Sequence, residues 1–78
     1  MNQNLIKEIL EERENQDQKW GEQNHHPYKW LVILGEEFGE ANKAILEKSL
    51  MEYRKEMIQV AAVSLAAIES LDRGKGIF

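Results

Sequence analysis

The sequence predicts an all-α fold of three helices, in which the second and third form an antiparallel hairpin. Ala, Leu, Glu, Lys and Gln dominate, β-branched residues are few, and apolar residues recur at helical spacing. A chain of 78 residues makes one domain, 1–78, whose core is marginal when it stands alone. Because there is no cysteine for disulfides or thiolate-bound metal, we expect self-association to complete a multi-helix bundle.

The first helix is expected from about Asn4 to about Asp17, with Asn4 as its N-cap. Its apolar stripe consists of Leu5, Ile6, Ile9 and Leu10. Turn-forming residues at 20–26 predict a loop. Pro27 suits the first turn of a second helix, which we expect to run to about Lys48.

The third helix is expected to begin after Ser49, because Ser49 and Glu52 form the Ser-x-x-Glu capping box. It should continue to about Arg73, and Gly74 should end it. Its apolar stretch, 57–68, is about a dozen residues long, whereas a membrane-spanning helix needs about 20. We therefore interpret it as a buried helix that packs against its own chain and a partner.

Charge and targeting signals narrow the function classes. The formal net charge is −4 and no basic stretch is present, which argues against nucleic acid as a partner. The first residues, 1–4, lack the basic and apolar regions of a signal peptide. We expect a soluble, cytoplasmic protein that does not bind membranes.

Four oxygen-bearing side chains lie on the wrong faces of their helices for a solvated surface. Glu37 and Glu40 are about 60° apart, with Glu37 inside the apolar arc of the second helix and Glu40 at its edge. Glu56 lies within the apolar arc of the third helix, with Gln59 about 60° away. Buried carboxylates must pair with a cation, take up a proton or bind a metal ion.

Two explanations fit this placement. If the two faces meet, four hard oxygen donors converge on Mg²⁺ or Mn²⁺, whose coordination is completed by water and by phosphates of a substrate. Alternatively, the glutamates form buried ion pairs with Lys43, Arg54 or Lys55 in a purely structural bundle. Glu-x-x-Glu spacing alone is common on solvated helices, so the placement in apolar arcs carries the metal hypothesis.

The motif Glu36-Glu37-Phe38-Gly39-Glu40-Ala41, followed by Glu56-Met57-Ile58-Gln59-Val60-Ala61-Ala62, resembles that of the MazG-like all-α nucleoside triphosphate pyrophosphohydrolases. Their signature is Glu-x-x-Glu, a spacer and Glu-x-x-Asp on two antiparallel helices. The upstream segment Asp17-Gln18-Lys19-Trp20-Gly21 is similar to one found in short members, many of them encoded by phages. The resemblance covers residues 10–73.

The resemblance implies a reaction and an assembly. Family members cleave nucleoside triphosphates between the α- and β-phosphates, releasing a nucleoside monophosphate and pyrophosphate, and assemble as homodimers or homotetramers. Glu37 and Glu40 match the first acidic pair and Glu56 the first acid of the second pair, so these are the expected Mg²⁺ ligands. Glu36 matches an additional acid, and Glu36 or Glu40 is the expected acceptor of the proton of the attacking water.

Gln59 departs from the family pattern, because an aspartate is expected at this position. Its amide oxygen can still bind metal, but it adds no charge and cannot act as a general base. The alternative function is therefore a catalytically inert helical module that binds a nucleotide or another protein.

The remaining aromatic, basic and glycine residues suggest substrate contacts and packing positions. The candidate substrate contacts are Trp20 for base stacking and Lys19, Lys29, Arg54 and Lys55 for phosphates. Trp30 is expected in the core. His25 and His26 are expected to be solvated, without a role in the site. Gly35 and Gly39 lie one turn apart and are expected to let another helix approach closely.

Overall fold

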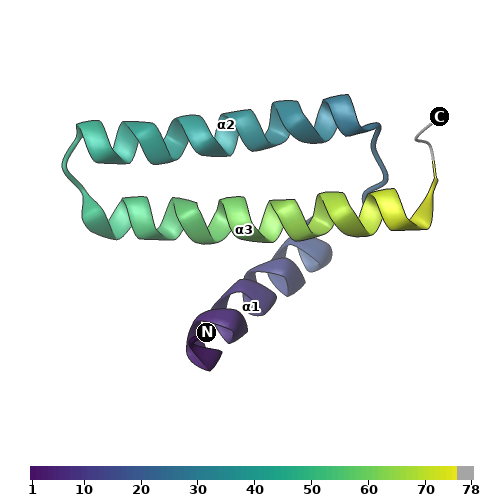
Figure 1. Ribbon diagram of the computed structural model, residues 1–78, viewed down its shortest axis with the longest axis horizontal. Coiled ribbons are helices and arrows are strands. Elements are labelled where there is room, and N and C mark those ends of the chain that lie inside the picture. The colour runs from purple at the N-terminus through teal and green to yellow at the C-terminus, as the bar shows by residue number, and fades with distance from the viewer. Residues whose placement is uncertain (76–78) are drawn as a thin grey trace.

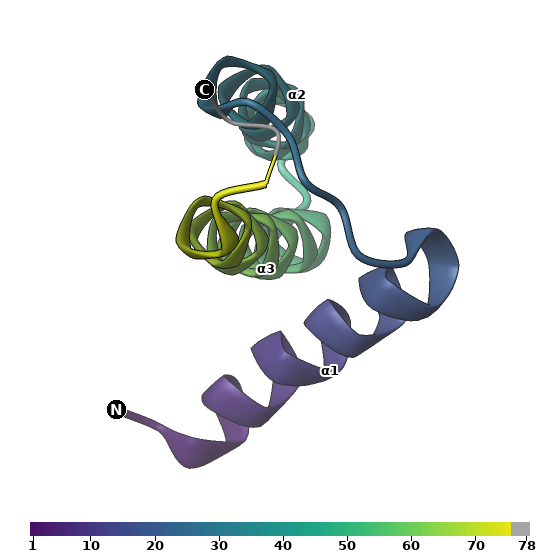
Figure 2. The same cartoon turned by 90° about the vertical axis from the view of Figure 1, so that its right-hand side faces the viewer.

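The computed structural model describes residues 1–75 and confirms the all-α prediction. These residues form three helices, α1 (Gln3–Trp20), α2 (Pro27–Leu46) and α3 (Leu50–Arg73), and no strand. Helices α2 and α3 lie side by side and antiparallel, and α1 packs obliquely against α3 (Figures 1 and 2). Helix α3 is thus the shared element of the fold. No described helix is both long and apolar enough to cross a membrane.

Local sequence signals fix most helix ends. Pro27 occupies the first turn of α2, and the Ser49 hydroxyl accepts a hydrogen bond from the Glu52 N–H at 3.2 Å. Gly74 ends α3 in the left-handed conformation, at φ 71°, which a glycine adopts without steric penalty. Lys48, at φ 58°, takes the same region in the short α2–α3 connection.

Three predicted helix ends were wrong. Asn2, not Asn4, caps α1, because its side chain accepts from the backbone N–H groups of Asn4 and Leu5. Helix α1 also continues beyond Asp17 to Trp20, where Gly21 takes a positive φ of 72°. Helix α2 ends at Leu46, two residues before the predicted end.

The core lies between α2 and α3. Trp30, Val63 and Ala66 form its buried cluster, against which Ile33, Leu34 and Ala67 pack. Trp30 is only 5% exposed, as predicted. Gly35 and Gly39 do not serve a close approach within this chain, since both are exposed and an added Cβ atom would meet nothing within 4 Å. That prediction was wrong for the hairpin itself.

Candidate functional site

Two glutamates from neighbouring helices meet at the α2–α3 interface. Glu37 on α2 and Glu56 on α3 are both half-buried. Burial raises the pKa of the Glu37 carboxyl above its ordinary value, and the adjacent Glu56 carboxyl raises this pKa further by repulsion and by a hydrogen bond. Smaller repulsions come from Glu40 and Glu36. The predicted convergence of Glu37 with Glu56 is therefore present.

This carboxyl pair has no basic partner in the described part of the chain. The ion pairs formed by residues 1–75 use other acids: Glu8, Asp17, Glu22 and Glu69. The structural alternative, in which Glu37 and Glu56 are neutralised by Lys43, Arg54 or Lys55, is therefore not seen. A pair of half-buried carboxyls without a cation favours uptake of a proton or of a metal ion.

The remaining predicted ligands are spread around this pair. Glu40 is exposed and, with Glu56 and Lys43, lines a hollow of about 300 Å³. Gln59 lines a separate cavity of about 210 Å³ together with Glu37. Among residues 1–75, no three His, Cys, Asp or Glu side chains are close enough to form a complete metal-binding group. The structure thus brings the Glu37 and Glu56 carboxyls together. Glu40 lines the hollow beside Glu56, and Gln59 lines the cavity beside Glu37.

The cavity beside Glu37 is bounded by all three helices and by the loop before α2. Its walls are Gln16, Trp20, Gln23, Trp30, Ile33, Glu37, Gln59, Val63 and Ala66. Trp20 is the last residue of α1 rather than a loop residue, yet it is 56% exposed as expected, with the Lys19 ammonium 4.5 Å from its ring centroid. Trp30 also lines the cavity, and its indole N–H is buried without a hydrogen-bond partner.

The predicted phosphate-binding cations are not gathered at the carboxyl pair. Arg54 forms two hydrogen bonds of 2.8 Å with Glu8 on α1. Lys29 lies near His25, whose pKa is lowered by burial and, to a smaller extent, by the Lys29 charge. Lys55 is exposed. Lys43, which the sequence suggested only as an ion-pair partner, lines the hollow beside Glu40 and Glu56.

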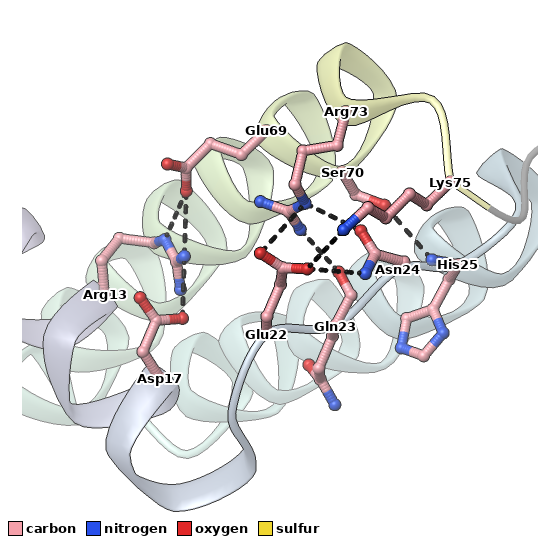
Figure 3. Close-up of polar contacts among 10 residues, drawn as sticks. All are labelled: Arg13, Asp17, Glu22, Gln23, Asn24, His25, Glu69, Ser70, Arg73 and Lys75. Atoms are coloured by element: carbon pink, nitrogen blue, oxygen red, sulfur yellow. Dashed lines mark hydrogen bonds and ion pairs between the residues drawn. The ribbon is translucent and has the colours of Figure 1, made fainter.

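A polar network holds α1 and the loop against the end of α3 (Figure 3). Arg13 on α1 bonds to Glu69 at 2.9 Å and to Asp17 at 3.0 Å. Arg73 donates to the Asn24 side chain at 2.8 Å. Further contacts join Arg73 and Lys75 to Glu22, Arg73 to the Gln23 carbonyl and the His25 N–H to the Ser70 hydroxyl. This network positions Trp20, Gln16 and Gln23 at the cavity.

Sequence reasoning missed Gln16, Gln23 and the network that places them. Only the Arg13–Asp17 spacing of four residues was visible as a local signal. The pairing of α1 with α3 joins residues far apart in the sequence, and no periodicity reveals such a register.

Comparison of the chain with protein families, with curated proteins and with solved structures gives no match. The resemblance to MazG-like enzymes therefore rests on the motif alone and stays a prediction. The site geometry has to support any functional proposal by itself.

Proposed function

We propose that this chain is a Mg²⁺-dependent nucleoside triphosphate pyrophosphohydrolase. The observation that carries the proposal is the meeting of Glu37 and Glu56 without a basic partner, beside a cavity walled by two indoles. Mg²⁺ typically binds one or two protein carboxylates, keeps several waters and takes its other ligands from substrate phosphates. Two carboxyls, rather than a closed cage of protein ligands, are consistent with that coordination.

Different side chains have different roles in the proposed reaction. Glu37 and Glu56 would hold the ion, and Glu40, one turn from Glu37, would add negative charge beside the pair. When bound, Mg²⁺ supplies neutralisation of the phosphate charge and a lowered pKa for bound water. Glu36 or Glu40 accepts the proton of the attacking water, because both are exposed and adjacent to the pair. The base stacks on Trp20 at the mouth of the cavity.

A second candidate is an inert helical module that binds a nucleotide or a protein partner. Gln59 favours it, because its oxygen accepts a hydrogen bond from Gln16 Nε2 at 3.2 Å and the side chain supplies no charge. Under this reading the chain binds without hydrolysis.

The deciding experiment measures pyrophosphate release from a panel of ribonucleoside and deoxyribonucleoside triphosphates, with and without Mg²⁺. We expect Mg²⁺-dependent release that Glu40→Gln and Glu37→Gln abolish while both variants remain folded. Glu11→Gln, an exposed glutamate on α1, is the matched control and should retain full activity.

Three results would reject or replace the proposal. Full activity of Glu40→Gln removes its proposed role. Absence of turnover across the panel, together with absence of Mg²⁺ binding in calorimetry, favours the inert module. A melting temperature that Mg²⁺ does not change, with Glu37→Ala destabilised, indicates a purely structural bundle.

A further inference from the structure

The orientation of two glutamine amides is fixed by partners that have only one hydrogen-bonding role. Arg13 Nη1 donates to Gln16 Oε1 at 3.3 Å, and Gln16 Nε2 donates to Glu12 Oε2 at 3.3 Å. A guanidinium can only donate and a carboxylate can only accept, so the oxygen and nitrogen of Gln16 cannot be exchanged. Gln16 therefore donates from Nε2 to Gln59, and the Gln59 atom that accepts this hydrogen bond, at 3.2 Å, is Oε1.

This pairing leaves the Gln59 amide nitrogen available at the cavity. Gln59 lines the cavity beside Glu37, and no described residue accepts a hydrogen bond from its Nε2. The buried side-chain polar atoms without a partner in residues 1–75 comprise Trp30 Nε1 alone, so Gln59 Nε2 is not completely buried. Its two N–H groups can donate to a ligand, while its oxygen is turned towards α1.

The chemical character of the site changes in order along α3. Glu56, Gln59, Val63 and Ala66 recur at spacings of three and four residues, so they share one face of the helix. Antiparallel to them, Glu37, Ile33 and Trp30 follow one another on α2. The order is therefore carboxyls, then the Gln59 amide, then the apolar pocket with its indoles. A nucleotide has the matching order of phosphates, sugar and base.

We infer that Gln59 Nε2 donates a hydrogen bond to a hydroxyl oxygen of the nucleotide sugar, which makes Gln59 a specificity-determining residue for the sugar instead of a ligand of the metal ion. This inference rests on the proposed function, because it requires a nucleotide whose phosphates lie at the Glu37–Glu56 pair. Gln16 has a positioning role, since it holds the Gln59 oxygen away from the ligand.

The test uses triphosphates with a methylene group between the α- and β-phosphorus atoms, which the proposed reaction cannot cleave. Ribose, 2′-deoxyribose and 2′,3′-dideoxyribose forms are titrated in the presence of Mg²⁺, with binding followed by tryptophan fluorescence and calorimetry. We expect the full chain to bind the dideoxy form about fivefold more weakly than the tighter of the other two, the loss of one neutral hydrogen bond. Gln59→Leu should bring this ratio to about one.

Control variants separate a sugar contact from a structural effect. Gln18→Leu, an exposed glutamine on α1 that does not line the cavity, should keep the wild-type ratio. Gln59→Met also removes the Nε2 donor and should likewise bring the ratio to about one. It replaces Gln59→Leu in the test if the leucine variant does not fold. Mg²⁺ affinity without nucleotide, measured by calorimetry, should be the same in the wild type and both Gln59 variants.

The outcomes distinguish this inference from the proposed function. A wild-type ratio retained in the Gln59 variants overturns the sugar contact and leaves the proposed function standing. A weaker Mg²⁺ affinity in these variants shows that the Gln59 oxygen binds metal, and it also overturns the inference. Failure of the wild type to bind any of the three nucleotides overturns both.

Discussion

Helix α3 is joined to its two neighbours by interfaces that differ in how many polar contacts cross them. Its contact with α2 is built from apolar side chains, with Trp30, Val63 and Ala66 at the centre. Helix α1, whose Leu5, Ile6 and Ile9 side chains are half-buried, contacts α3 also through the Arg13–Glu69 and Arg54–Glu8 ion pairs and the Gln16–Gln59 hydrogen bond. Burial of apolar surface drives folding without dependence on screening, whereas exposed ion pairs contribute little and weaken in salt.

This difference shows that the walls of the cavity beside Glu37 are held in place by two different interfaces. Two of its walls, Trp30 and Glu37, belong to the hairpin, but Gln16 and Trp20 come from α1, which is held in part by polar contacts. The carboxyl pair should therefore keep its geometry under conditions that loosen α1. The stacking residue and the partner of Gln59 should be lost first.

The largest loss of stability should come from a substitution in the apolar interface between α2 and α3. Trp30→Ala removes the largest side chain of the buried cluster and should lower the free energy of unfolding by about 3–5 kcal/mol. Urea denaturation followed by circular dichroism measures it. Tyr28→Ala, an aromatic substitution on the same helix at a side chain that is 76% exposed, should change stability by less than about 0.5 kcal/mol. Equal losses in the two variants would contradict the assigned core.

A smaller and more local effect is expected at the polar interface. The Arg13 side chain is 14% exposed and bonds to three acceptors, so Arg13→Met should cost about 2 kcal/mol. Hydrogen exchange should show faster exchange throughout α1 while protection in α2 and α3 is retained. Uniformly faster exchange in all three helices would mean that α1 belongs to the same cooperative unit as the hairpin.

At the Glu37–Glu56 pair, a substitution is expected to raise the stability of the protein instead of lowering it. The pKa of Glu37 is raised in the folded state above its ordinary value of 4.5, so the folded protein binds this proton more tightly than the unfolded chain. Stability therefore falls as pH rises from the unfolded pKa to the folded pKa, and the loss is complete above the folded pKa. Without Mg²⁺, Glu37→Gln should raise the melting temperature at pH 7 and flatten its decline above pH 4.5.

The control for this titration is Glu11→Gln, whose side chain is exposed on α1. It should leave both the melting temperature at pH 7 and its pH dependence unchanged. A lower melting temperature for Glu37→Gln would show that the charged form is stabilised by a partner, contrary to the geometry of the pair.

The smallest effect is expected at the Arg54–Glu8 ion pair. Both side chains are largely exposed, so Arg54→Met should alter stability less than Arg13→Met does. Adding salt should reduce the remaining difference between wild type and Arg54→Met, because screening weakens exposed pairs. Melting curves at low and high NaCl measure it, and a salt-independent difference would indicate packing of the arginine stem instead.

The sequence predicted what local chemistry decides. Pro27, Ser49 and Gly74 mark helix ends through their own backbone and side-chain properties, and each was confirmed. Glu37 and Glu56 were placed at the hairpin interface because the helical period fixes which face a side chain occupies. Asn2 and Asn4 are equally suitable caps, so composition alone could not choose between them.

The walls of the cavity were not predictable in the same way. Gln16 and Gln23 reach it because α1 and the loop are fixed by Arg13 and Arg73, whose partners lie far away in the sequence. Lys43 was considered only as an ion-pair partner, since a helical wheel shows its direction but not the hollow it lines. Helix direction is local information, whereas the docking of one helix on another is set by pairs that the pattern does not encode.

The three-residue connection between α2 and α3, residues 47–49, has a consequence for folding kinetics. The hairpin can begin to close through contacts next to this connection, while the bonds that dock α1 span 43 to 56 residues. Closing a long loop costs more entropy than closing a short one, so the hairpin should form early in folding. Helix α1 is synthesised before α3, which carries its docking surface, so it should dock late.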